Sequence, residues 1–575
     1  MSFTTLPFLV LVALSVAAYY LLPQRVQWMA LLAASMVFYC VGGGKTVLYV
    51  FYTAVIVYGS GLLLGRFNDL RRAAPKEEKK AITARYKPYR RAVVLVACLA
   101  NFGLLYVLKY WNFTADLFQP LADQLRPGTQ IPLSELVLPL GISFFMFQSV
   151  GYVIDVYRDK YAPEKNFAKL LLFVSFFPQM VQGPISRFND LAPQLFARRS
   201  LDYTDLKYGI QLILWGYFKK MVIADRAAVL VNTVLDDPWS YSGSILAVGV
   251  LFYCIQLYGD FSGGIDITRG VARLFGIDLA ENFRRPLFST SLTDFWRRWH
   301  ITLGAWMRDY LFYPLSLSKP FGKLGKFTRK HLKGKLGKIL PTSLATFLVY
   351  FVIGIWHGAN WRYVAFGFWN GGIITLSLLL APYFLRWKQA LRINDKSKGW
   401  HLFQLVRTNL LVFFGRYITR APRFLTAVWM VKETFLHPNL PDLWNGTLMT
   451  LGLGGGDFLI LFLGWLPCCW PNGIRRKKAP SVPCWNGSPP SCNGWPFWCR
   501  WWSCSASACC GPTTSPRILS TSNSNNRRFP WIPNDGWPVF WLRFCCWGLP
   551  WSGSTTGWTP LGSFPISPWS GPPTR

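Results

Sequence analysis

Apolar residues in this chain gather in long uninterrupted blocks that are separated by short polar segments. Each block approaches the roughly 20 residues that a helix needs to cross a bilayer, and none shows the alternation of a barrel strand. The pattern therefore predicts an all-α, polytopic membrane protein with about 11–12 transmembrane helices, a number set by this length rule. The spans are expected near residues 6–23, 26–42, 46–65, 92–109, 136–155, 168–185, 207–224, 243–262, 340–358, 362–385 and 403–419, with another that starts near 446.

Two of these blocks are interrupted by residues that break helices. Pro139 and Gly141 interrupt one, and Pro178, Gly183 and Pro184 interrupt the other. Broken helices at membrane depth are tolerated where they face protein or water. The two interruptions are either ordinary kinks or the walls of a cavity between helices.

A more polar stretch follows, between residues 263 and 315. Its segment STSLTDFWRRWHITLGAWMRDYLFYPL opens with Ser291 and Asp294 at the spacing of a capping box, and Trp and Arg residues then alternate. Aromatic rings beside guanidinium groups suit the headgroup region of a bilayer. We therefore expect a re-entrant or interfacial helix here.

Charge gives the orientation of the chain. The net charge is +35, and the basic residues concentrate in two segments, 66–91 and 319–338, which we predict to be loops. Basic loops are retained on the cytoplasmic side, where they also meet anionic lipid headgroups. Three spans precede the first loop, so the N-terminus is expected outside a cell (inner, cytoplasmic) membrane. Neither loop shows a recognition motif, so no nucleic-acid partner is expected.

Composition changes abruptly near residue 466. The last 110 residues hold ten of the 13 cysteines and a single acidic residue, Asp535. We therefore divide the chain into a membrane domain, 1–465, and an anomalous tail, 466–575. The tail is either a disulfide-rich domain or the product of a shifted reading frame, in which leucine codons are read as Trp and Cys. The irregular cysteine spacing favours the second interpretation, and the tail is then disordered or non-native.

One histidine lies in lipid-compatible sequence. His357, in GIWHGANW, stands about 25 Å along its helix from Leu340, the expected cytoplasmic start of the span. A neutral imidazole at that depth can act as a general base, and small neighbours leave room for a ligand. A structural histidine bonded to a carbonyl is the other interpretation. No second His or carboxylate stands at ligand spacing, so no metal site is expected.

Other polar residues near the membrane have both a structural and a functional interpretation. His300 lies in the interfacial segment, where it either bridges headgroups or takes part in catalysis. Asp260 and Asp266 lie near the end of a span, and Arg269 and Arg273 follow at helical spacing, so we expect these arginines to neutralise the acids. No role is predicted for the three remaining histidines, which are His331, His401 and His437.

Six sequence segments together resemble the membrane-bound O-acyltransferase family. They occur in the order PLGISFFMFQSVGYVIDVYR, FPQMVQGPISRF, YFKKMVIADR, YGDFSGGIDI, ENFRRPLFSTSLTDFWRRWHITLGAWMRDYLFYPL and IWHGANWRYVAFGFWNG. The likeness covers roughly residues 5–460 and the two histidine motifs are long enough to be specific. Within the family, the chain is most similar to the bacterial branch of alginate O-acetylation and teichoic acid D-alanyl transfer proteins.

The resemblance implies a ring of helices around a thin centre with a central funnel. It implies acetyl transfer from a cytoplasmic thioester, acetyl-CoA or an acyl-carrier thioester, to an extracytoplasmic polysaccharide hydroxyl, with a possible SGNH-type partner protein. His357 is then the base and His300 has a supporting role. The residues expected to position the substrate or to hold the two histidines are Asn360, Trp356, Asp309 and Arg298.

Two alternatives remain open at this stage. Within the same class, the reaction is D-alanyl transfer to teichoic acid from a carrier-protein thioester. In a different class, the chain is a polysaccharide flippase or transporter, which also needs broken helices and a polar cavity. The sequence shows no internal repeat of the kind found in many transporters, which argues against this second alternative.

Overall fold

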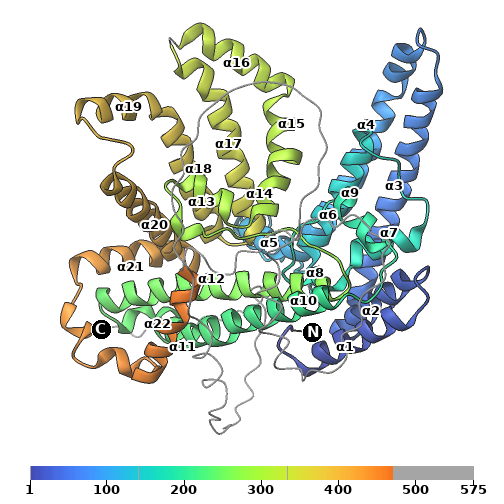
Figure 1. Ribbon diagram of the computed structural model, residues 1–575. Helices are drawn as coiled ribbons and strands as arrows, with labels where there is room; N and C mark the ends of the chain where they lie inside the picture. The colour runs from blue at the N-terminus through green and yellow to red at the C-terminus, as the bar shows by residue number, and fades with distance from the viewer. Residues whose placement is uncertain (1, 137, 140, 333, 470–575) are drawn as a thin grey trace, which may run out of the picture. The chain divides into compact units, whose positions relative to one another are not determined.

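The computed structural model describes residues 2–469, apart from 137, 140 and 333 (Figure 1). Within these residues every regular element is helical, and strand-type pairing is limited to one bridge between Phe283 and Trp299. The predicted all-α class is confirmed. Of the predicted tail, residues 466–469 continue the last described helix, and the rest lies outside the described residues.

The first five helices include most of the segment that was predicted to be the first basic loop. The basic segment 66–91 was expected to be a loop, but most of it is helical, because its Ala, Lys, Arg and Glu residues favour helix. It forms the end of one long helix and the start of the next. The five helices are α1 (Leu6–Leu21), α2 (Gln27–Gly43), α3 (Val47–Ala73), α4 (Lys79–Lys109) and α5 (Trp111–Leu125).

The two predicted interruptions are present and they touch each other. Gly141 has a positive φ of 75° at the start of a helix, and a methyl group on it would overlap the carbonyl oxygen of Met180. Glycine is needed here for both reasons. The helices around the breaks are α6 (Ile142–Tyr157), α7 (Phe167–Ser175), α8 (Phe177–Met180) and α9 (Phe188–Leu195).

Two long helices then pack against each other through glycine. In Figure 1, α10 (Tyr203–Tyr217) and α12 (Gly243–Leu274) lie side by side. A methyl group on Gly216 would lie 2.7 Å from the carbonyl oxygen of Gly263, and one on Gly270 would lie 2.7 Å from that of Gly209. Small residues let helix backbones approach closely in a membrane, where hydrophobicity alone does not hold helices together. We call these four residues the glycine ladder: Gly209, Gly216, Gly263 and Gly270.

The acids of α12 are neutralised by lysines from a π-helical turn, η2 (Phe218–Ala224), which connects α10 to α11 (Asp225–Asp236). Lys219 Nζ lies 2.8 Å from Asp266, and Lys220 Nζ lies 2.8 Å from Asp260. The structural interpretation of both acids is supported, but the main partners differ from those predicted. Arg269 lies 3.6 Å from Asp266, whereas Arg273 pairs with Asp205 of α10.

The predicted interfacial helix is broken into short pieces. The pieces are α13 (Leu292–Arg298), α14 (Ile301–Met307), the π-helical turn η5 (Arg308–Phe312) and α15 (Tyr313–Ser316). Ser291 accepts a hydrogen bond from the Asp294 backbone N–H at 3.1 Å, so the predicted helix cap is confirmed. The second basic segment also holds a helix, α16 (Lys319–His331), where a loop was expected.

The remaining helices form the C-terminal part of the described chain. They are α17 (Leu336–His357), α18 (Trp361–Leu379), α19 (Ala381–Ala390), α20 (Lys398–Arg420), α21 (Phe424–Leu436) and α22 (Gly455–Cys469). Short 3-10 turns lie at Gly44–Thr46, Pro238–Ser240, Pro286–Phe288, Leu440–Leu443 and Thr447–Thr450. The neighbours α17 and α18 pack along each other as a hairpin (Figure 1).

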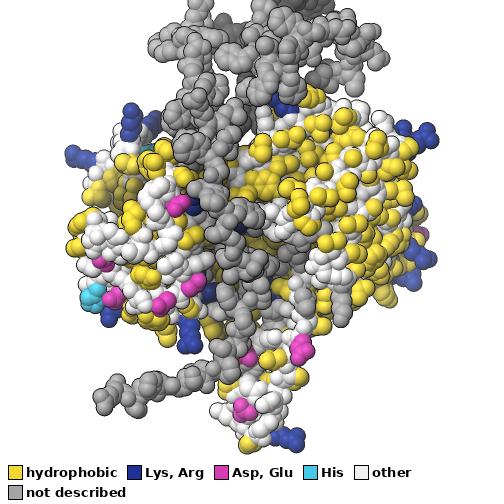
Figure 2. Space-filling view, turned by 90° about the horizontal axis from the view of Figure 1, so that it is seen from below, with side chains coloured by type: hydrophobic (Ala, Val, Ile, Leu, Met, Phe, Trp, Pro, Cys, Tyr) yellow, Lys and Arg dark blue, Asp and Glu magenta, His cyan; other side chains and the backbone are white. Residues whose placement is uncertain are grey.

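Membrane spans are less regular than the apolar blocks suggest. By length and composition, four described helices can cross a bilayer, namely α3, α4, α12 and α17, and the pair α18 and α19, bent by 61°, makes a fifth if it counts as one span. Shorter apolar helices are α1, α2, α6 and α22. Figure 2 shows hydrophobic side chains spread over a broad surface, as expected for a protein that faces lipid, and Leu14 and Leu21 of α1 are mostly exposed.

Replacing Gly216 by alanine should destabilise the protein. The added methyl group has no space between α10 and the backbone of α12, so overpacking should cost about 1–3 kcal/mol of the free energy of unfolding. The matched control is Gly103→Ala in α4, where the methyl group meets no atom within 4 Å. There alanine should stabilise the helix by about 0.5–1 kcal/mol. Thermal melts in detergent test both variants, and equal melting temperatures would contradict the close packing.

Candidate active site

His357 is the last residue of α17 and stands at the turn of the α17–α18 hairpin. Gly358 and Ala359 form the turn, and Asn360 caps α18, since its side-chain oxygen accepts a hydrogen bond from the Arg362 backbone N–H at 3.0 Å. A methyl group on Gly358 would collide with the Tyr363 ring. The motif HGAN thus makes a tight turn that leaves the imidazole at the end of the apolar helix.

The imidazole of His357 lies among aromatic rings. Its ring centroid is 4.9 Å from that of Trp356, 5.7 Å from Phe366 and 6.3 Å from Tyr363. The side chain is partly exposed, and no described group forms a hydrogen bond with either ring nitrogen. The alternative of a structural histidine bonded to a carbonyl is therefore not supported by the described residues. Both nitrogens can meet a substrate.

The carbonyl of Trp356 fixes this end of α17. It accepts a hydrogen bond from Lys109 Nζ at 2.6 Å and another from the Tyr110 hydroxyl at 2.9 Å. Carbonyls in the last turn of a helix lack partners within the helix, and a cation there also interacts favourably with the helix dipole. The end of α4 therefore positions Trp356 and, through it, His357.

His300 occupies the break between α13 and α14. Its backbone is left-handed, with a φ of 50°, and its side chain is 3% exposed. The strained conformation is held by segment 282–284, which pairs with segment 298–301 through hydrogen bonds from Arg284 N to Arg298 O and from Ile301 N to Asn282 O. Strain of this kind persists only where the surroundings determine it, and such residues concentrate at functional sites.

Asn282 determines how His300 bonds. Its side-chain oxygen accepts hydrogen bonds from the backbone N–H and the hydroxyl of Thr302, at 2.9 and 3.0 Å. His300 Nδ1 lies 3.2 Å from the amide nitrogen and 3.4 Å from this oxygen, and because the oxygen already accepts two hydrogen bonds, donation from the amide nitrogen satisfies the network best. A neutral imidazole whose Nδ1 accepts carries its proton on Nε2. In this arrangement His300 offers an N–H donor, whereas His357 has no fixed partner.

The two histidines meet around Trp356. The ring centroids of His300 and Trp356 lie 6.4 Å apart, and Phe144 of α6 lies 6.3 Å from each. The structure thus brings together four of the six residues singled out in the sequence, which are His357, His300, Trp356 and Asn360. The indole N–H of Trp356 is buried, and no described group accepts it. A buried donor without a partner suggests that a ligand or water completes the site.

The other two predicted residues lie in ion pairs away from these rings. Arg298 pairs with Asp294 one turn earlier in α13, with 3.0 Å between the charged atoms. Asp309 accepts hydrogen bonds from Arg187 and Arg308. Although burial alone would raise the pKa of the Asp309 carboxyl, the hydrogen bonds and charges of these two arginines outweigh it and lower the pKa.

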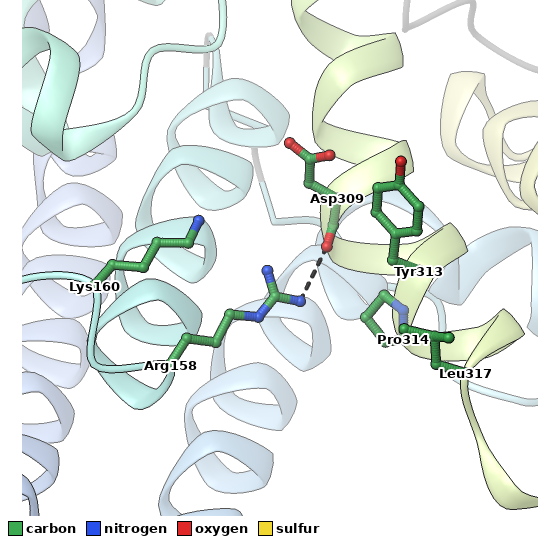
Figure 3. A pocket seen from close by; sticks show the side chains of 6 residues that line it. All are labelled: Arg158, Lys160, Asp309, Tyr313, Pro314 and Leu317. Carbon is green, nitrogen blue, oxygen red and sulfur yellow. Dashed lines mark hydrogen bonds between the residues drawn. The ribbon is translucent and has the colours of Figure 1, made fainter.

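Asp309 belongs to a basic pocket of about 440 Å³ (Figure 3). Arg158 crosses the pocket and donates to the backbone oxygen of Asp309 at 3.0 Å, and Lys160 lies beside it. Nearby, the ring of Tyr310 has three cations within 5.8 Å, which are Arg158, Lys160 and Arg187. The pocket therefore carries more positive than negative charge, as an anion-binding pocket needs.

A column of aromatic rings joins this pocket to the histidines. Centroid distances are 5.1 Å from Tyr310 to Trp306, 4.3 Å from Trp306 to Phe147 and 5.3 Å from Phe147 to Trp356. On the other side of the hairpin turn, an apolar pocket of about 880 Å³ is lined by Asn360 together with side chains of α18, α20 and α21. The ring column thus leads from His357 toward the basic pocket, and Asn360 of the HGAN turn lines the apolar one.

Sequence reasoning missed three polar residues of this site. They are Lys109, Asn282 and Arg416, the last of which lies over the ring of Trp299 beside His300. A basic residue inside an apolar block was a usable signal for Lys109 and Arg416, because ionisable groups in a membrane are commonly functional. Among the described residues, no group of three or more His, Cys, Asp or Glu could hold a metal ion.

Comparisons with known proteins agree on one family. The sequence profile of the membrane-bound O-acyltransferase family matches residues 158–389, which include His300 and His357. The protein named probable alginate O-acetylase AlgI of Pseudomonas syringae pv. tomato is 32% identical over 72% of this chain and 71% of its own length. The peptidoglycan O-acetyltransferase of Helicobacter pylori is 31% identical over 50% of this chain and 55% of its own length.

A third relative transfers a different group. The teichoic acid D-alanyltransferase of Bacillus subtilis is 27% identical over 56% of this chain and 76% of its own length. The matches to these relatives thus span acyl groups as different as acetyl and D-alanyl.

Replacing Asn282 by alanine should destabilise the site around His300. The substitution leaves Thr302 N, the Thr302 hydroxyl and His300 Nδ1 without their partner, and each unsatisfied buried group costs about 1–3 kcal/mol. Unfolding by denaturant in mixed micelles measures the loss. Asn189→Ala is the control, since this exposed side chain donates a hydrogen bond to the neighbouring Asp190 and takes no part in a buried network. Equal stability of the two variants would show that Asn282 is not the hub of this network.

Proposed function

Because the chain belongs to the membrane-bound O-acyltransferase family, we propose that it moves an acetyl group from a thioester donor to a hydroxyl of a cell-surface polysaccharide. That it is a multi-pass membrane O-acyltransferase follows from its relatives and its apolar helices. The names of the relatives, alginate O-acetylase and peptidoglycan O-acetyltransferase, support acetyl as the group and an envelope glycan as the acceptor. The observation that carries the proposal is the partly exposed His357 imidazole with both nitrogens free.

His357 acts as the general base in this proposal. The acceptor hydroxyl attacks the carbonyl carbon of the thioester while an imidazole nitrogen takes its proton. The carbon–sulfur bond then breaks, the proton passes to the leaving thiolate, and the products are an acetyl ester and a free thiol. The aromatic rings around His357 keep water from competing as the nucleophile.

Two N–H groups beside His357 are available for the substrate. His300 carries its proton on Nε2 in the arrangement set by Asn282, and the Trp356 indole N–H has no acceptor in the described structure. Such donors stabilise the negative charge that develops on the carbonyl oxygen during acyl transfer. This assigns His300 and Trp356 to positioning the thioester carbonyl, and Asn360 to holding the turn that carries His357.

The substrates would approach from opposite sides of a cell (inner) membrane. The basic segments 66–91 and 319–338 favour a cytoplasmic location for the ends of α3, α4 and α17 that adjoin them. The basic pocket around Asp309 then suits the phosphate-bearing part of a cytoplasmic donor, acetyl-CoA or an acyl-carrier thioester. The glycan, or an SGNH-type partner protein that carries the acetyl group onward, would take it on the outer side.

D-alanyl transfer to teichoic acid is the second candidate. The D-alanyltransferase relatives support it at 27% identity, below the 31–32% of the O-acetylases. The family membership favours either transfer over the polysaccharide flippase that the sequence left open.

Replacing His357 by alanine should abolish most acetyl transfer. Loss of a general base lowers the rate about 10²–10⁴-fold. The measurement is the acetate released by mild base from the surface glycan of cells that express the full chain. His401→Ala, an exposed histidine far along the sequence in α20, is the control and should retain wild-type acetate.

Three results would count against the proposed function. Unchanged acetate in His357→Ala would remove His357 as the base. D-alanine released in place of acetate would favour the second candidate. No acyl group added to the glycan by the wild-type chain would remove acyl transfer to glycans altogether.

Replacing Trp356 by phenylalanine should weaken turnover without unfolding the site. Phenylalanine keeps an aromatic ring among the histidines but lacks the N–H, and one hydrogen bond is worth about 0.5–1.5 kcal/mol, or roughly a 2- to 10-fold loss of kcat/KM. Trp400→Phe in α20 is the control, because its indole N–H is also buried without a described acceptor. If both variants keep wild-type kcat/KM, the Trp356 N–H does not contact the substrate.

A further inference from the structure

Among the described residues, one buried cation near the break at His300 has no ion-pair partner. Arg416, in α20, is 7% exposed, and its guanidinium lies over the ring of Trp299 at 5.3 Å from the centroid. Trp299 precedes His300, so the Arg416 side chain reaches from α20 to the break that carries His300. Arg416 therefore lies against the break that carries His300.

The side chain of Arg416 differs from the other arginines of this helix. Arg420 contacts the carboxylate of Asp236 at 2.6 Å, and Arg407 donates to the backbone oxygen of Thr290 at 2.8 Å. Within the described ranges, no carboxylate and no other acceptor is bonded to the Arg416 side chain. A ring face under the guanidinium leaves its five N–H groups, which lie in the plane, free to donate.

Other cations near the histidine site are bonded to neutral groups. Lys109 Nζ is bonded to the neutral carbonyl of Trp356, and Arg362 bonds to the neutral carbonyl of Ala421. The acid of α13, Asp294, is already paired with Arg298. An unpaired charge in a membrane interior is costly, and such residues commonly serve substrate pathways. A guanidinium is always charged, so the site cannot lower this cost by losing a proton.

We propose that Arg416 binds an oxyanion group, a carboxylate or a phosphate, that a substrate brings to His357. The guanidinium fits this group because it offers parallel N–H donors to two oxygens at once. The inference deepens the proposed function and rests on it. Two sources supply the same chemistry: a carboxylate on the acceptor glycan or a phosphate on the thioester donor. In either case Arg416 holds the substrate against the base.

Binding measurements separate this inference from the catalytic proposal. The purified full chain in detergent is titrated with three probes: a uronic-acid hexasaccharide, a neutral hexose hexasaccharide and CoA. We expect one anionic probe to bind the wild type, and Arg416→Gln to weaken that binding about 10- to 100-fold, the range for a hydrogen bond to a charged group. Loss for the hexasaccharide assigns the acceptor carboxylate, and loss for CoA assigns the donor phosphates.

Two variants distinguish binding from packing. Arg416→Lys keeps the charge and should restore at least part of the affinity, although a single ammonium cannot bind two oxygens as the guanidinium does. Arg407→Gln, in the same helix, removes an arginine that already has an acceptor and should leave the affinity unchanged. Should Arg416→Gln fail to fold, Arg416→Lys carries the test, with a smaller loss expected for the same probe.

Several results would overturn the inference. It fails if neither anionic probe binds the wild type, if both bind the glutamine variant with wild-type affinity, or if the neutral hexasaccharide loses as much affinity as the anionic one. These outcomes are independent of turnover. The proposed function fails separately, if the wild type binds substrates but transfers no acetyl group to the glycan.

Discussion

The bond between Lys109 and the carbonyl of Trp356 is the constraint on which the site depends. A helix that ends inside a membrane leaves carbonyls without partners and without water to replace them. Lys109 and Tyr110 supply both missing donors from the end of α4. With that carbonyl fixed, the Trp356 ring lies between the two histidines, and His357 begins the turn into α18.

The two histidines are built differently, and the difference suits different tasks. His300 is enclosed and bonded through Nδ1 to Asn282, whose own oxygen is occupied by Thr302. Its protonation state is therefore tied to a network. The His357 imidazole packs against aromatic rings and forms no described hydrogen bond, so it can gain or lose a proton without breaking a hydrogen bond within the protein. A site that needs one steady donor and one reversible base can be made from two imidazoles in this way.

The sequence predicted what local patterns control. The apolar blocks predicted the positions of most helices. Ser291 predicted a helix N-cap, and the short motif HGAN indicated a turn beside His357. Helix ends were harder to predict, because residues 66–91 are polar and yet favour helix. The break at His300 depends on pairing with segment 282–284, and the contacts of Lys109 with Trp356 and of Arg416 with Trp299 join segments that are distant in the sequence. The spacing of residues along the sequence does not predict contacts between segments that are far apart in the chain. The role expected of Asp309 came from the family resemblance, since the sequence alone gives no measure of how far η5 lies from the histidines.

The glycine ladder has a consequence for how the membrane part assembles. The backbones of α10 and α12 touch at Gly209, Gly216, Gly263 and Gly270, which recur every seven residues along each helix. A shift of one helix by one turn would place side chains against backbone carbonyl groups. The lysines of η2 reach Asp260 and Asp266 only in the correct register. Close backbone packing and charge neutralisation therefore favour the same register, because a hairpin that docks in another register leaves two unpaired carboxylates in lipid.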